Sequence, residues 1–207
     1  MGATSMMYER MQRDFTTTAW VLIPVAVGLN LVGRFIVQTL RIPLFLDSQG
    51  TFLLGIIGGP WVAAVGGILT SITIAVGLDP GSLPFVIVQI ALGIASGILA
   101  YRGWFIIETA SEHWKLIACG LILGLVSLLL STPIAAYVFG GVTGAPSDVL
   151  TGVFLSTGQN IFQSVLSGRI IVAPVDKTAS VIVAYYIATN IPDRYLPERG
   201  RKALGRD

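Results

Sequence analysis

Charged residues are almost missing from the long central part of this chain. Only twelve charged side chains occur between residues 15 and 190, while the short segments 1–14 and 191–207 hold the other twelve. Charged residues make up 12% of the chain, against roughly 25% in soluble domains. Apolar runs such as 17–40 reach the roughly 20 residues that a helix needs to cross the hydrocarbon core of a bilayer. The sequence therefore predicts an all-α, multi-pass protein of the plasma membrane.

Proline and glycine residues divide the apolar sequence into six expected transmembrane helices. The motif GGPW at 58–61 splits the stretch 51–77, which is too long for one crossing, because proline suits the first turn of a helix. The helices are expected at about 17–40, 48–58, 60–77, 84–101, 114–139 and 172–191, the second of them short. They form one membrane domain over 1–207, with an N-terminal tail (1–14), a helical bundle (15–192) and a basic C-terminal tail (193–207).

The segment 148–169 has helical length but carries many Ser, Thr, Asn and Gln residues. We expect it to be an extra amphipathic or re-entrant helix between the fifth and sixth crossings. Basic residues in both tails favour a cytoplasmic location for both ends, which requires an even number of crossings. These residues are Arg10, Arg13, Arg194, Arg199, Arg201, Lys202 and Arg206. A second even arrangement leaves 51–77 undivided and counts 148–169 as a crossing, and the loop charges do not separate the two.

In the preferred topology, eight charged residues fall in the outer half of the bundle, and their signs cancel. They are Arg34, Arg41, Asp47, Asp79, Asp148, Arg169, Asp176 and Lys177. Ionisable groups near membrane depth usually face one another or a cavity. One interpretation is a set of salt bridges that tie the outer loops together. The other is an outward-facing pocket for a polar solute, in which zero net charge favours a zwitterionic or uncharged solute over a polyanion.

Few residues suit catalytic chemistry. The chain has one cysteine, Cys119, and one histidine, His113, which excludes an internal disulfide and a multi-histidine metal site. It has no nucleophile elbow and no phosphate-binding glycine loop. We therefore expect no enzymatic activity, no metal or other cofactor and no nucleic-acid partner.

Three motifs in order suggest a family. The run IPLFLDSQGTFLLGIIGGPWVAAVGGILTSI is followed by GGVTG and by PVDKTASVIVAYYIATNIP. Together they resemble the substrate-binding S components of energy-coupling factor (ECF) transporters, in particular a subgroup of uncertain substrate with a Leu-Asp-Ser-x-Gly-Thr loop after the first helix. The resemblance covers most of 17–192. It implies a six-helix protein that captures a vitamin or related micronutrient from outside and works with a membrane coupling protein and two cytoplasmic ATPase subunits.

The resemblance also implies a binding site at the outer side of the bundle. Carried onto this sequence, it singles out Asp47, Ser48, Gln49, Asp79, Ser82, Gln89, Gln159, Asn160, Gln163 and Asp176. Asp47 has an alternative role, because an Asp-Ser pair before an apolar run often caps a helix.

Docking of the coupling protein is the second property that the resemblance implies. Many S components carry an Ala-x-x-x-Ala motif in the first helix, whereas the comparable spacing here runs from Ala26 to Asn30. The predicted docking residues are Ala26, Gly28, Asn30, Ala63 and Gly67. Small residues at this spacing are also typical of internal helix packing.

A function from another class is a membrane-embedded sensor or scaffold without transport activity. In that case the polar outer cluster would detect a solute rather than deliver it. Copurification of ATPase subunits separates the two hypotheses.

Overall fold

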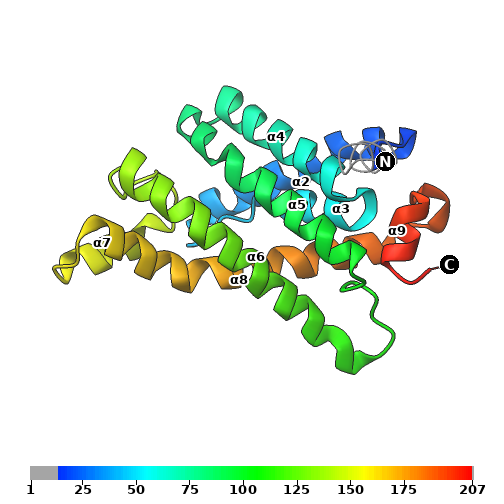
Figure 1. The fold of residues 1–207 in the computed structure, drawn as a ribbon. Coiled ribbons are helices and arrows are strands. Elements are labelled where there is room, and N and C mark those ends of the chain that lie inside the picture. Colours follow the sequence, from blue (N-terminus) through cyan, green and yellow to red (C-terminus); the bar gives the residue numbers. More distant parts are fainter. Residues whose placement is uncertain (1–13, 207) are drawn as a thin grey trace, which may run out of the picture.

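The computed structural model describes residues 14–206, and every regular element in this range is helical (Figure 1). The basic residues Arg10 and Arg13 of the predicted N-terminal tail lie outside the described range. The α-helices are α2 (Thr17–Leu40), α3 (Gln49–Gly58), α4 (Pro60–Gly77), α5 (Val86–Tyr101), α6 (Trp114–Pro133), α7 (Asp148–Ser156), α8 (Ile161–Asn190) and α9 (Glu198–Ala203). Short helical turns are η1 (Pro80–Phe85), η2 (Ala110–His113), the π-helical η3 (Ile134–Val138) and η4 (Asp193–Tyr195).

The all-α prediction is confirmed for the described range, and several of its helices are long and apolar enough to cross a membrane. These stretches are Thr17–Leu40, Pro60–Gly77, Pro80–Tyr101, Ala110–Val138 and Ile161–Asn190. The remaining predicted crossing, α3, has 10 residues and is therefore about 15 Å long. That is about half of the roughly 30 Å hydrocarbon core. As a helix, α3 does not reach across a bilayer alone.

The predicted division between 148–169 and 172–191 is wrong, because the chain breaks earlier. α7 ends at Ser156 and α8 runs without interruption for 30 residues. At the break, Gly158 has a φ of +87°, and the Asn160 side chain caps α8 by accepting a hydrogen bond of 2.9 Å from the Gln163 amide. The polar residues that suggested a surface helix therefore form a turn and the first turn of a long helix.

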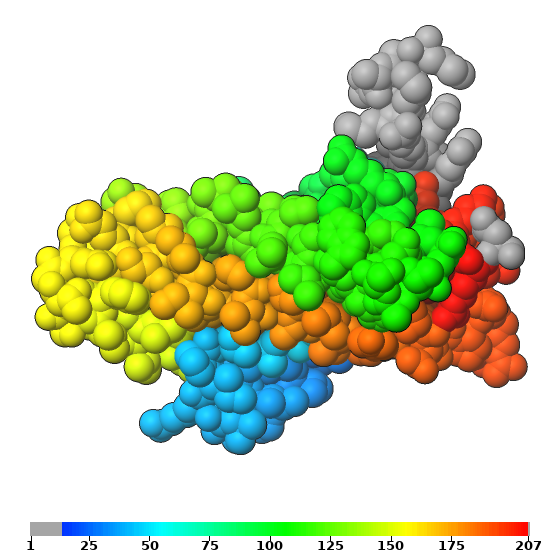
Figure 2. All heavy atoms as spheres, turned by 90° about the horizontal axis from the view of Figure 1, so that it is seen from below, coloured from blue at the N-terminus to red at the C-terminus, as the bar shows by residue number. Residues whose placement is uncertain are grey.

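The helices pack around α3, which has all ten of its residues buried. It contacts α2, α4, α5, α8 and α9, while α6 lies against α8 and α4 against α5. Figure 1 shows that α2 begins and α9 ends at one end of the bundle, whereas α7 lies at the other. Seen along another direction, the end of α2 and the segment that follows it project beside α8 (Figure 2).

Two larger apolar clusters among residues 14–206 meet at α3. The larger one joins α3, α5, α6 and α8 and includes Phe52, Leu92, Leu123 and Val181. The smaller one joins α2, α3 and α4 and includes Ile23 and Leu54. Because α3 contributes to both clusters, burial of its apolar side chains connects the two halves of the bundle.

Four of the five predicted docking residues lie inside the chain. Ala26, Asn30 and Ala63 are at most 1% exposed, and Gly67 is buried against the backbone of Gln89. Asn30 donates hydrogen bonds of 3.0 Å to the hydroxyls of Thr51 and Thr70 and accepts one of 2.6 Å from the Gly50 amide. The docking interpretation is thus corrected for these four, since they hold α2 and α4 against neighbouring helices of the same chain. Gly28 alone has open space beside it.

Gly97 of α5 allows the closest approach of α5 to α4. A Cβ atom built on Gly97 would lie 2.3 Å from the Pro60 backbone nitrogen. We expect Gly97→Ala to lower the free energy of unfolding by about 1–3 kcal/mol, the usual cost of overpacking. The matched control is Gly28→Ala on α2, which meets no atom within 4 Å and gains helix propensity. Thermal unfolding in detergent should show a lower midpoint for Gly97→Ala alone, and equal midpoints would contradict the packing argument.

Candidate functional site

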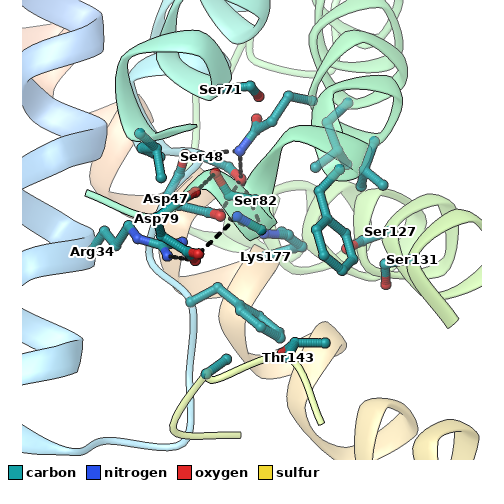
Figure 3. Close-up of a pocket in the computed structure, with 18 of the residues that line it drawn as sticks. Arg34, Asp47, Ser48, Ser71, Asp79, Ser82, Ser127, Ser131, Thr143 and Lys177 are labelled. Carbon is teal, nitrogen blue, oxygen red and sulfur yellow. Dashed lines mark hydrogen bonds and ion pairs between the residues drawn. The ribbon is translucent and has the colours of Figure 1, made fainter. Parts of the chain in front are cut away.

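A polar cavity of about 80 Å³ lies among the helices near the end that carries α7. Its wall combines parts of α2, α4, α5, α6 and α8 with the segment before α3, the α4–α5 connection and the segment before α7. The charged residues in the wall are Arg34, Asp47, Asp79, Arg169 and Lys177, and the uncharged polar ones are Ser48, Ser71, Ser82, Gln89, Ser127, Ser131 and Thr143. Figure 3 shows Asp47 and Lys177 on one side and the two α6 serines on the other.

The segment between α2 and α3 re-enters the bundle to form one wall. α2 ends at Leu40, and the cap residue that follows, Arg41, has a left-handed backbone conformation with a φ of 51°. The chain then turns inward, and the backbone amides of Phe45 and Leu46 each donate a hydrogen bond of 2.8 Å to Oδ1 of Asp176. Asp176 lies near the middle of α8, so this segment reaches deep into the bundle before α3 begins.

A buried group of charges anchors this segment. Lys177 Nζ lies 2.7 Å from Asp176 Oδ2 and 3.4 Å from Asp47 Oδ1, and it donates a hydrogen bond of 3.0 Å to Ser48 Oγ. The side chains of Lys177 and Asp176 are 3% and 0% exposed. We call Asp47, Asp176 and Lys177 the buried charge cluster.

The alternative role of Asp47 as a helix cap does not fit its contacts. The residue that precedes α3 is Ser48, and no side chain makes a capping hydrogen bond there. The Asp47 carboxylate accepts a hydrogen bond of 2.9 Å from the Ser48 hydroxyl and pairs with Lys177. Asp47 therefore links the segment before α3 to α8 and does not cap the N-terminus of α3.

Gln89 and Gln49 take different positions. Gln89 of α5 lines the cavity, and its Nε2 donates hydrogen bonds of 3.0 Å to the Asp47 carbonyl and 3.3 Å to Ser48 Oγ. Gln49 does not line the cavity, because its side chain packs beside Gly33 of α2, where an added Cβ would lie 2.5 Å from Gln49 Nε2. Gln89 thus holds the wall of the cavity, whereas Gln49 fills the α2–α3 interface.

Asp79 and Ser82 lie at the rim. The Asp79 carboxylate forms an ion pair of 2.9 Å with Arg34 of α2, and the two side chains are 37% and 16% exposed. Asp79 also caps η1 by accepting a hydrogen bond of 3.0 Å from the Gly81 amide, while Ser82 Oγ donates one of 2.8 Å to the Asp79 carbonyl. At the rim, the salt-bridge interpretation of the outer charges applies, since this pair links α2 to the α4–α5 connection.

The structure does not bring Gln159, Asn160 and Gln163 to the cavity. Asn160 and Gln163 are exposed at the start of α8, where the first caps the amide of the second. Gln159 Oε1 accepts a hydrogen bond of 3.2 Å from the hydroxyl of Ser167. These three residues therefore do not line this cavity, and their polar groups lie at the turn between α7 and α8, so contact with a solute stays a prediction.

Sequence reasoning missed the far side of the cavity. Ser127 and Ser131 lie one turn apart on α6 and face it, and a four-residue spacing of serines in an apolar helix is the signal that would have revealed them. Arg169 was sorted with the outer charges but not assigned to the site. Its guanidinium donates a hydrogen bond to Ser131 Oγ and lies 5.5 Å and 5.7 Å from the ring centroids of Phe45 and Phe85.

No protein-family model matches the chain, and comparisons with curated proteins and with solved structures find no similar one. Among residues 14–206 there is no group of three or more His, Cys, Asp or Glu side chains placed to hold a metal ion. The cavity itself offers hydroxyls, an amide and charged groups beside aromatic rings. This combination suits the non-covalent binding of a small polar molecule.

Removal of Lys177 tests the buried charge cluster. We expect Lys177→Met to lower the free energy of unfolding by about 3–5 kcal/mol, because it leaves the buried carboxylate of Asp176 and the partly buried one of Asp47 without their cation. In the double variant Asp176→Asn/Lys177→Met, the loss in the free energy of unfolding should be smaller than the sum of the losses in the two single variants. Lys202→Met, at an exposed ion pair on α9, is the control with little expected effect. Thermal unfolding would contradict the interpretation if Lys177→Met behaved like Lys202→Met.

Proposed function

We propose that this chain is the substrate-binding S component of an ECF-type transporter and captures a vitamin or related micronutrient. The observation that carries this proposal is the polar cavity inside a bundle of apolar helices. Burying ionisable groups at membrane depth is costly, and such groups usually mark a solute or ion pathway. A chain that needed only a stable bundle would gain more from apolar residues at these positions.

The path of the chain supports six crossings. The re-entrant segment 42–48 followed by α3 passes from the cavity end of the bundle to the opposite end, so the two together amount to the second crossing. With this crossing, α2 begins and α9 ends on the same side (Figure 1). The basic residues of the C-terminal tail favour the cytoplasm for that side. The cavity then opens toward the outside, where an uptake protein meets its solute.

The size of the cavity places a condition on capture. Sites for drug-sized ligands have volumes of roughly 300–1,000 Å³, well above the 80 Å³ found here. A vitamin therefore requires movement of part of the wall.

Transport also requires energy from other subunits. In the proposed complex, a membrane coupling protein and two cytoplasmic ATPase subunits supply it. Purification of the tagged chain from its own membranes should yield these proteins, identified by their nucleotide-binding sequence motifs. A solute-binding chain that never copurifies with an ATPase would contradict transport and favour the sensor hypothesis.

Mass spectrometry of small molecules released from the purified chain tests the site. We expect one compound near equimolar amount in the wild type, reduced at least tenfold in Gln89→Leu, which removes an amide from the cavity wall. Gln159→Leu is the matched control, because this residue lies outside the cavity. Ser127→Leu, which places bulk in the cavity, serves as a second variant if Gln89→Leu elutes as an aggregate. Equal amounts of compound in all variants would show that the solute binds elsewhere.

A further inference from the structure

Arg169 is the buried cation of the cavity that lacks a carboxylate partner. The residue is 6% exposed and lines the cavity. Its guanidinium carries five N–H donors, and the hydrogen bond found for it among residues 14–206 goes to a neutral hydroxyl, that of Ser131. No carboxylate of the described residues lies within 4 Å of it, whereas Arg34 and Lys177 both have such a partner.

The carboxylates of the same region have other partners. Asp47 and Asp176 share Lys177, and Asp79 pairs with Arg34. Asp148 accepts hydrogen bonds of 2.6 Å and 2.8 Å from the backbone amides of Thr143 and Gly144. Asp148 and Asp47 attract Arg169 at longer range, but no carboxylate of the described residues is in contact with its guanidinium.

The surroundings of Arg169 combine hydroxyls with aromatic rings. Ser127 and Ser131 of α6 line the cavity beside it, and the rings of Phe45 and Phe85 lie within 6 Å of its guanidinium carbon. Aromatic faces and a single hydroxyl stabilise a buried cation less than an anion in direct contact does. The arrangement is therefore suited to an incoming group that is negatively charged and attached to an apolar body.

We propose that the solute of this cavity carries a carboxylate that binds the guanidinium of Arg169, with its apolar part against Phe45 and Phe85. This inference deepens the proposed function and rests on its cavity, since it names the chemical class of the solute. A guanidinium presents paired donors that match the two oxygens of a carboxylate. The solute is thus a small organic acid with a flat or aliphatic apolar portion.

A matched set of probes tests the charge of the solute. Benzoate is compared with benzamide, and hexanoate with hexanamide, by their effect on the thermal unfolding midpoint of the purified chain in detergent. We expect each carboxylate to raise the midpoint in a concentration-dependent way and its neutral amide to have little effect. Arg169→Gln should weaken the apparent affinity for the carboxylate at least tenfold, because a charge-assisted contact is lost.

Two further variants make the test specific. Arg41→Gln removes the same charge from an exposed position at the end of α2 and should leave the preference for carboxylates unchanged. Arg169→Lys keeps the positive charge without the paired donors and should retain part of the preference for carboxylates. This variant keeps the test usable if Arg169→Gln does not fold. The proposal is overturned if amides stabilise as well as carboxylates, if no carboxylate stabilises the wild type, or if Arg169→Gln keeps the preference.

The outcome is independent of whether the chain transports its solute. Carboxylate binding through Arg169 without copurifying ATPase subunits would sustain this inference and contradict transport. A neutral compound released from a complex that contains ATPase subunits would contradict this inference and sustain transport.

Discussion

The buried charge cluster is the interaction on which the cavity depends. The Asp176 carboxylate accepts hydrogen bonds from the backbone amides of Phe45 and Leu46. Lys177 pairs with the Asp47 carboxylate and donates a hydrogen bond to the Ser48 hydroxyl. Two adjacent residues of α8 thus hold both the backbone and the side chains of the re-entrant segment. Each ion is expensive to bury alone, and only the mutual contacts offset that cost. The cluster therefore fixes where the segment before α3 can lie and where the cavity wall stands.

Around this cluster, the bundle separates two kinds of packing. Glycine and alanine allow close contact of α4 with α5 and of α2 with α3, as at Gly97 and Gly50. At the cavity, by contrast, α6 presents two serines and α8 presents Arg169 and Lys177 to a common polar space. Close packing joins α4 to α5 and α2 to α3, whereas α5, α6 and α8 together line the polar cavity.

Apolar runs and their interruptions predicted most of the helices, because helix length in a bilayer is set by hydrophobic thickness. The same reasoning misplaced the start of α8, since polar residues such as Gln163 are tolerated in the first turn of a helix that extends past the apolar core. Asp47, Gln89 and Asp79 were recognised because they stand out in apolar surroundings. Ser127 and Arg169 were not assigned to the site, because the orientation of a helix about its axis depends on tertiary contacts.

The short helix α3 joins the two ends of the molecule. Its first residues follow directly on Ser48 in the cavity wall, and at its other end the backbone of Ile57 contacts Gly200 of α9, where an added Cβ would lie 3.0 Å from the Ile57 carbonyl oxygen. An α-helix changes little in length under load, because its hydrogen bonds run parallel to its axis. Because α3 follows the cavity wall at one end and contacts α9 at the other, it forms a stiff, fully buried connection between these two parts of the molecule.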